Sequence, residues 1–243
     1  MTENGFIIHR YKSVTSTNDV LKEMAEKGAP EWTAVVAEQQ TEGRGREGRR
    51  WYSPRGSLYL SVLLKPAILP IELQRMPLII SYALAELLMQ DGGDFALKWP
   101  NDILLNGRKV AGVLLEARTQ GKDVHYIVAG MGINISLGQN SLPADLRDRV
   151  AVLEEIIGDW SIESMIKRIY SSLKIHHGSF RGEAWERIRE KWSDYADWDT
   201  PVLLREGNRE VAGYPQCLSD DGSLVLRTSE GVMNIHSGDI TTG

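Results

Sequence analysis

A segment rich in glycine and arginine interrupts the apolar pattern near the start of this chain and limits how the rest can fold. Residues 41–56 contain the run GRGREGRRW at positions 43–51. The segment is too polar and too rich in glycine for a buried strand or a stable helix, so we predict a long loop. Loops longer than about 12–15 residues in compact domains are usually functional or disordered. The fold must therefore hold a long cationic loop between two regular elements.

Apolar segments around this loop predict an α+β fold that ends in a small all-β region. Strands are predicted at residues 6–14, 33–38, 58–64, 95–98, 103–105, 109–117 and 124–135. Helices are predicted after the N-cap candidates of residues 13–18 and at residues 74–89, 147–157, 164–175 and 184–192. Short strands at residues 201–205, 210–212, 223–227 and 232–236 alternate with turns and indicate a small β-barrel. We therefore predict two domains, residues 1–196 and residues 197–243.

Composition excludes several classes of protein. The formal net charge is −5 and the pI about 5.6, which argues against a dedicated binder of double-stranded DNA, so no DNA partner is expected. A helix needs about 18 apolar residues to span a bilayer, and no apolar run approaches this length, so no membrane partner is expected. The first residues lack the basic-then-apolar pattern of a secretory signal. The single cysteine, Cys217, excludes an intramolecular disulfide and a multi-cysteine metal site, which fits a cytoplasmic protein.

The loop combines features that suit a small anionic ligand. Its glycines leave backbone N–H groups free to converge on an anion. Four arginines and one glutamate give residues 43–50 a local charge of +3, and arginine forks match phosphate oxygens. Trp51 offers a flat face for a base or a lid. A solvated basic loop or a nucleic-acid-binding tract would have the same composition, but the spacing matches neither a P-loop nor a Rossmann fingerprint.

Three further motifs contain candidate binding residues. The turn KWPND at residues 98–102 precedes a strand that begins with Lys109 and includes Gly112. A lysine at a strand's first residue can point to solvent, whereas a buried one needs a partner, and a strand glycine indicates close approach of a ligand or backbone. Ser-Thr-Asn at residues 16–18 heads a helix and either caps it or binds a polar ligand head. The run GMGINI at residues 130–135 is either a tightly packed strand or the floor of a pocket.

Taken together and in this order, the motifs resemble those of the biotin protein ligases (biotin–acetyl-CoA-carboxylase ligases). The shared patterns are Ser-Thr-Asn, Gln-x-x-Gly-Arg-Gly-Arg-x-Gly-Arg-x-Trp, Lys-Trp-Pro-Asn-Asp, Lys-x-Ala-Gly and Gly-x-Gly-Ile-Asn, within residues 16–134. The resemblance implies a mixed sheet with flanking helices, of the class II synthetase-like kind of biotin and lipoate ligases, plus a C-terminal SH3-like barrel. It also implies that ATP activates biotin as biotinyl-5′-AMP, with Mg²⁺. A lysine of a biotin carboxyl carrier protein then accepts the biotin.

The resemblance assigns roles to residues of this chain. Arg44 and Arg46 would bracket the biotin carboxylate and the phosphate, and Lys109 would lie at the bond-forming centre, so these three are the catalytic candidates. Asn101 and Asp102 would orient Lys109, the ribose or Mg²⁺, and no metal site made by the protein alone is expected. The residues implied in binding biotin and ATP are Ser16, Thr17, Asn18, Gln40, Gly43, Arg44, Gly45, Arg46, Arg49, Trp51, Lys98, Asn101, Asp102, Lys109, Gly112, Gly132 and Asn134.

The chain also departs from that pattern. About a dozen residues precede Ser13, too few for the helix-turn-helix domain of some relatives, so we expect a ligase without repressor function. Glu47 stands where some relatives have arginine, and no basic residue follows Gly238. The nearest alternative is a lipoate or octanoate protein ligase; the others are a nucleic-acid-binding module and a non-catalytic biotin sensor. Some relatives dimerise, and exposed strand edges would allow a homodimer here.

Overall fold

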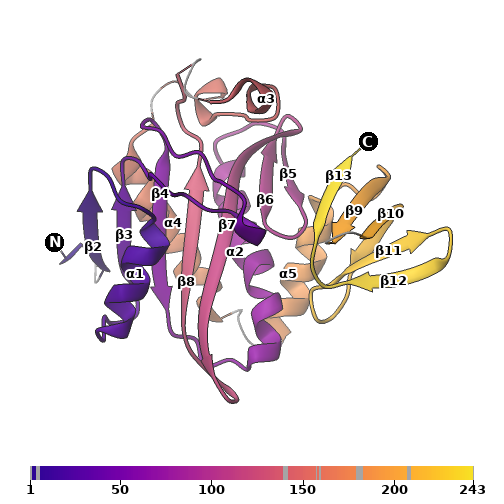
Figure 1. Cartoon of the computed structure of the whole chain (residues 1–243), viewed down its shortest axis with the longest axis horizontal. Coiled ribbons are helices and arrows are strands. Elements are labelled where there is room, and N and C mark those ends of the chain that lie inside the picture. Colours follow the sequence, from indigo (N-terminus) through magenta and orange to yellow (C-terminus); the bar gives the residue numbers. More distant parts are fainter. Residues whose placement is uncertain are drawn as a thin grey trace.

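The computed structural model describes residues 2–3, 6–138, 142–156, 158, 160–178, 183–206 and 209–242. Within these residues it contains a larger mixed sheet and a smaller antiparallel sheet (Figure 1). The larger sheet has the strand order β1-β2-β3-β4-β8-β7-β6-β5, in which β2 and β3 are parallel and the other neighbours antiparallel. Its strands are β1 (Thr2–Glu3), β2 (Phe6–Tyr11), β3 (Thr33–Ala37), β4 (Leu58–Leu64), β5 (Phe95–Lys98), β6 (Asp102–Leu105), β7 (Arg108–Gln120) and β8 (Asp123–Ile133). The predicted α+β architecture with a mixed sheet is confirmed.

Side chains alternate between the two faces of this sheet along each strand, and helices cover the two faces unequally. The main core packs one face against α2 and α4, with α5 against α2, whereas Leu63 of β4 packs with Leu21 and Ala25 of α1 on the other. Figure 1 shows α1 on the near face and the other three helices behind the sheet. The helices are α1 (Thr17–Glu26), α2 (Met76–Met89), α4 (Ile162–His177) and α5 (Glu183–Asp194). Among the described residues, no helix is both long and apolar enough to cross a membrane.

The predicted arginine-rich loop crosses the part of the near face that α1 leaves open. We call its residues 43–51 the arginine strap. The strap folds back on itself, because Gly45 N donates to Arg49 O (2.7 Å) and Trp51 N donates to Gly43 O (2.9 Å). In Figure 1 this segment passes in front of β8 and β7 toward the smaller sheet. The strap is therefore folded into a compact turn by its own backbone bonds.

The smaller sheet has the order β12-β11-β10-β9-β13 and is antiparallel throughout. Its strands are β9 (Val202–Glu206), β10 (Arg209–Leu218), β11 (Leu224–Thr228), β12 (Gly231–Ile235) and β13 (Asp239–Thr242). β10 pairs with β9 through its first half and with β11 through its second, with a bulge between Pro215 and Cys217. The predicted end of this strand at residue 212 is wrong, because the bulge accommodates the proline. This sheet occupies the place predicted for the SH3-like barrel, and the predicted boundary between residues 196 and 197 stays a prediction.

The predicted helix at residues 147–157 is wrong. α3 (Ala144–Arg147) ends where that helix was to begin, and the helix's last residue lies outside the described residues. Beyond α3 the backbone pairs with β7: Lys109 N donates to Arg149 O (2.9 Å) and Ala151 N donates to Lys109 O (3.0 Å). These groups serve a tertiary pairing and are not available to a helix, so long-range contact overrode the helical pattern. The same pairing fixes the backbone of Lys109.

Replacing Gly56 by alanine is expected to destabilise the fold. Gly56 has φ +102°, which non-glycine residues rarely adopt, and an added Cβ would overlap the carbonyl oxygen of Ser136. Strain of this kind costs about 2 kcal/mol or more, which corresponds to about 4–8 °C in Tm for a chain of this length. Thermal unfolding checks this, with Gly121→Ala as control, because residue 121 also has positive φ (+61°) but open space around it. Equal losses in the two variants would show that the overlap at Ser136 is not the cause.

Candidate active site

Buried polar side chains gather on the near face where α1 begins. The backbone N and the hydroxyl of Thr17 lie 2.8 and 3.1 Å from Gln40 Oε1, and Gln40 Nε2 donates to Ser53 Oγ (2.9 Å). The Ser61 hydroxyl of β4 lies 2.8 Å from Thr17 Oγ1 and 2.6 Å from Asn18 Oδ1. The motif at the head of α1 and the glutamine before the strap are therefore brought into one polar cluster. Such a cluster can orient the polar head of a ligand.

Capping of α1 does not explain this motif. Ser16 occupies the N-cap position, is buried, and makes no side-chain capping bond. Ser61, which the sequence analysis missed, is the signal that could have been noticed: it is a buried hydroxyl in the otherwise apolar strand LYLSVLL. A hydroxyl in such a strand needs a hydrogen-bond partner, and here α1 supplies it.

Gly130 of β8 allows the cluster to lie close to the sheet. A Cβ at residue 130 would overlap the side-chain oxygen of Asn18. With that space free, Asn18 Nδ2 reaches Glu116 Oε2 of β7 (2.7 Å). The first glycine of the glycine-rich run in β8 therefore lies directly beneath the polar cluster.

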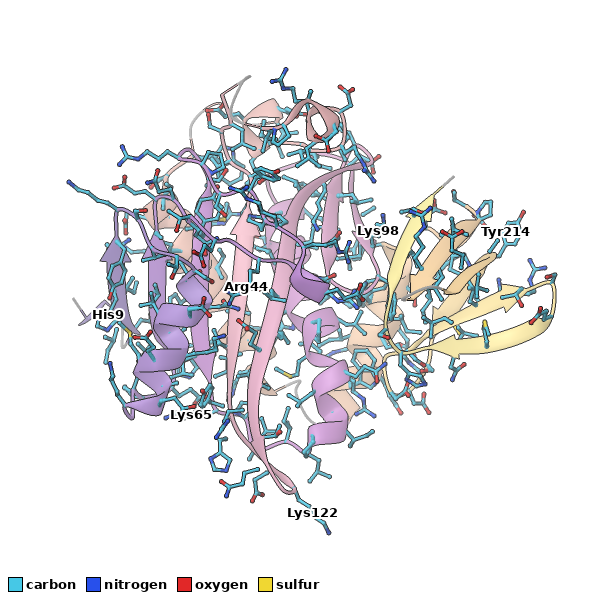
Figure 2. The ribbon with its side chains drawn as sticks, in the orientation of Figure 1. His9, Arg44, Lys65, Lys98, Lys122 and Tyr214 are labelled. Carbon is cyan, nitrogen blue, oxygen red and sulfur yellow. The ribbon has the colours of Figure 1, made fainter. Side chains whose placement is uncertain are left out.

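Arg44 of the strap lies against the first turn of α1 in a network of four charges, and Figure 2 shows it between α1 and the centre of the sheet. Its two terminal nitrogens each lie 2.6 Å from an oxygen of Asp19. Lys22 Nζ lies 2.9 Å from Asp19 Oδ1 and 2.8 Å from Glu116 Oε1, and Glu116 is 3.8 Å from Arg44. The hydrogen bonds from Arg44 hold the pKa of Asp19 at about 2, although partial burial opposes this shift. The acidic partners of Arg44 were not identified from the sequence.

Stability should fall at acid pH partly through Asp19. Its folded-state pKa of about 2 lies below its ordinary 3.8, so the unfolded chain binds this proton more readily. The stabilisation is therefore complete above about pH 4 and is lost as the pH falls toward about 2. We expect urea unfolding to show a smaller loss of stability between about pH 5 and 3 for Asp19→Asn than for the wild type. Parallel pH profiles for the two proteins would contradict the assignment.

A bulge turns Lys109 toward the near face. In the pairing of β6 with β7, Ile103 faces Ala111 and Leu104 faces Lys109, so Val110 is an extra residue. Without it Lys109 would point to the core face, because sides alternate along a strand, and bulges commonly re-aim side chains in this way. The Lys109 side chain is one-third exposed (33%) and paired, rather than fully solvated.

Two groups hold the Lys109 amine. Its Nζ lies 2.6 Å from Asp102 Oδ1 and 5.0 Å from the centre of the Trp51 ring. Asn101 instead donates from Nδ2 to Val113 O (2.5 Å), and Asn134 Nδ2 donates to the backbone oxygen of Lys109 (3.3 Å). Asp102 therefore orients the amine, whereas Asn101 and Asn134 support the backbone around it.

Trp51 at the end of the strap lies flat on two glycines of the sheet. A Cβ at residue 132 would lie 2.6–2.7 Å from the indole ring, and one at residue 112 would lie 3.2 Å from it. The indole Nε1 is buried and has no hydrogen-bond partner among the described residues. Gly112 and Gly132 therefore form the surface on which the Trp51 ring packs. The indole N–H is a donor that a ligand can use.

Arg46 connects the strap to the smaller sheet. Its NH1 donates to Gly238 O (3.3 Å), and its guanidinium lies 5.9 Å from the Trp99 ring centre. Trp99 Nε1 in turn donates to Gly222 O (3.2 Å) of the smaller sheet. The C-terminal region therefore reaches the strap through a backbone carbonyl.

The remaining predicted residues lie around this arrangement. Gly43 is packed so closely that a Cβ would overlap Ser53 Oγ, whereas at Gly45 the nearest neighbour of an added Cβ is 3.7 Å away. Arg49 is exposed at the strap tip. Lys98 ends β5 on the side nearer the smaller sheet (Figure 2). The structure thus assembles a polar cluster, the Arg44 network and the Lys109–Trp51 centre along one face, with Arg46 at its border.

Comparisons with known proteins agree with this arrangement. The model of the biotin/lipoate A/B protein ligase family matches residues 11–134. The bifunctional ligase/repressor BirA of Bacillus subtilis is 32% identical over 234 residues, which cover 95% of this chain and 72% of the relative. The biotin–[acetyl-CoA-carboxylase] ligase of Paracoccus denitrificans is 28% identical over 215 residues, 86% of this chain and 90% of the relative.

A solved structure extends the likeness to the whole fold. The biotin protein ligase of Aquifex aeolicus, in complex with biotin and ATP, superposes with a TM-score of 0.82 at 32% identity, covering 97% of each chain. The family model spans half of the chain, and the match to the Aquifex structure includes the smaller sheet. This chain therefore belongs to the biotin/lipoate A/B protein ligase family.

Proposed function

We propose that this chain activates biotin with ATP to biotinyl-5′-AMP and transfers the biotin to a specific lysine of the biotin carboxyl carrier protein of acetyl-CoA carboxylase. Family membership and the names of the relatives support the reaction class. The observation that carries the proposal is the Lys109 amine, held by Asp102 beside Trp51 on the face that the arginine strap crosses.

The first step brings two anions together. A biotin carboxylate oxygen attacks the α-phosphorus of ATP, the bond to the β-phosphate oxygen breaks, and pyrophosphate leaves. Lys109 neutralises the negative charge on the oxygens of the reacting phosphate, and Arg44 and Arg46 approach the carboxylate and phosphate oxygens from the strap. In a site that excludes water, these cations stabilise the transition state more than they would in solution.

The polar cluster at the head of α1 suits the ring end of biotin. Thr17, Asn18, Gln40 and Ser61 offer donors and acceptors that match a ureido group, which has both N–H and C=O groups. Gly130 of β8 keeps this cluster close to the sheet, because an added Cβ there would overlap the side chain of Asn18. Ser16, buried at the same point, completes the polar lining.

The second step needs no nucleophile from this chain. The lysine amine of the carrier attacks the acyl carbon of the adenylate, the bond to the phosphate oxygen breaks, and AMP leaves. Trp51 covers the adenylate and limits its hydrolysis, and its buried indole N–H can donate to a ligand oxygen. We assign Lys98 and Arg49 to contacts with the nucleotide, whereas Asn101 supports the strand beside it through its bond to Val113 O.

Mg²⁺ fits this site as a companion of ATP. The described residues contain no group of three or more His, Cys, Asp or Glu side chains that could hold a metal ion. Mg²⁺ is commonly bound through substrate phosphates and one or two carboxylates. Asp102 is the carboxylate beside Lys109 that would contribute. When bound, the ion neutralises phosphate charge.

Transfer of labelled biotin to a carrier-domain lysine tests the proposal. The chain, ATP, Mg²⁺ and a biotin carboxyl carrier domain should give label on the domain, and omission of ATP should abolish it. A carrier domain with its acceptor lysine replaced by arginine controls for non-specific acylation. Labelling with lipoate or octanoate and none with biotin would overturn the choice of substrate.

A further inference from the structure

We propose that Asp19 is an internal competitor for the anionic substrates, which occupies Arg44 until substrate displaces it, and that Lys22 retains Asp19 when Arg44 leaves. This inference rests on the proposed function, in which Arg44 meets the biotin carboxylate and the phosphate. Asp19 and Lys22 would then determine how tightly substrate binds, although neither touches it.

Asp19 occupies an edge of Arg44 that can bind an anion through two parallel hydrogen bonds. Both terminal nitrogens of the guanidinium lie 2.6 Å from the two carboxylate oxygens, an arrangement in which two parallel hydrogen bonds form. A substrate carboxylate or phosphate offers the same pair of oxygens to the same edge. Substrate and Asp19 therefore compete for it.

The four charges of the network cancel. Arg44 and Lys22 are opposed by Asp19 and Glu116, all within 3.8 Å of a partner of opposite charge. An anion that approaches this network meets a neutral group in which two carboxylates repel it. Arg44 attracts the anion fully only after it separates from Asp19.

Lys22 lowers the free-energy cost of separating Arg44 from Asp19. Its Nζ lies 2.9 Å from Asp19 and 2.8 Å from Glu116, so both carboxylates stay paired when Arg44 moves to substrate. The side chains of Arg44, Asp19 and Lys22 are each about one-third exposed (33%, 32% and 33%), so water can replace a lost contact during the exchange.

Substitutions of the two neighbours should therefore act in opposite directions. Asp19→Asn removes the competitor and should lower the KM for biotin about 2- to 5-fold, the size expected for one partly exposed charge pair. Lys22→Met leaves Asp19 dependent on Arg44 and should raise the KM by a similar factor. Asp19→Glu retains the competing carboxylate and should stay near the wild-type KM.

Biotin-dependent exchange of pyrophosphate into ATP, measured against biotin concentration, gives these constants. Asp91→Asn is the matched control, because it breaks a comparable ion pair with Arg168 (2.7 Å) and should leave the KM unchanged. Hydrogen exchange gives a second readout: without ligand, the strap should exchange faster in Asp19→Asn than in the wild type, and saturating biotin and ATP should reduce this difference.

The outcomes distinguish two roles for Asp19: a competitor that substrate displaces from Arg44, and a fixed support that stays bound to Arg44. A higher KM in Asp19→Asn, or shifts in the same direction for Asp19→Asn and Lys22→Met, would overturn the inference and show that Asp19 stays bound to Arg44 in the complex. An active wild type with opposite shifts supports it. A wild type without any biotin-dependent exchange would instead overturn the proposed function.

Discussion

Lys109→Ala is expected to lower the rate of biotin activation by on the order of 10²–10³-fold, the usual cost of losing one group that stabilises transition-state charge. The amine is placed by a bulge, by Asp102 and by the Trp51 ring, so no neighbouring side chain can replace it without moving the strand. Pyrophosphate exchange at saturating biotin and ATP measures the effect on the chemical step.

Stability should change little in the same variant. The Lys109–Asp102 pair is partly exposed, with side chains 33% and 21% accessible, and pairs of this kind contribute about 0–1 kcal/mol. Lys122→Ala is the matched control, because Lys122 lies exposed at the far tip of the β7–β8 hairpin (Figure 2). Normal exchange activity in Lys109→Ala would show that the reacting centre has been placed wrongly.

Gly132→Ala is expected to increase the escape and hydrolysis of biotinyl-5′-AMP and to lower transfer by on the order of 10²-fold, as small displacements in active sites do. The added methyl would lie 2.6–2.7 Å from the Trp51 ring, closer than two carbon atoms can pack, so the ring must leave its seat. The ratio of free adenylate released to biotin transferred measures the loss of cover.

A double-mutant cycle shows whether Gly132→Ala acts through the Trp51 ring or through the strand itself. In a Trp51→Ala background, Gly132→Ala should have little further effect, because the ring that it displaces is already absent. Gly178→Ala, where an added Cβ meets nothing within 4 Å, should behave as the wild type. Full additivity of Gly132→Ala and Trp51→Ala would mean that the methyl acts on something other than the indole.

The sequence predicted those parts of the fold that local patterns determine. The strand at residues 58–64 and the helix after residues 13–18 match β4 and α1, because a near-continuous apolar run specifies the first and helically spaced apolar residues specify the second. The predicted helix at residues 147–157 does not form, because backbone groups of this segment hydrogen-bond instead with Lys109 and with the residues that follow β8. Such pairing depends on residues far away in the chain, which local periodicity does not report.

In the site, too, local patterns predicted some features, whereas others depend on long-range contacts. Motif spacing identified Arg44, Trp51 and Lys109, but it did not show that an extra residue at position 110 turns Lys109 to the same face as Gly112. Nor did it reveal that Asp19 holds Arg44, because a carboxylate in the first turn of a helix is usually explained by the helix dipole alone. Register and long-range ion pairs arise only when the strands meet.

A crystal structure with biotinyl-5′-AMP, or with biotin and a non-hydrolysable ATP analogue, would show directly whether the reaction takes place between Lys109 and the arginine strap. We expect the acyl-phosphate group within hydrogen-bonding distance of Lys109 Nζ, with its oxygens contacted by Arg44 or Arg46 and the Trp51 ring over the ligand. Clear density for the ligand elsewhere, with the strap and Lys109 out of its reach, would contradict the account.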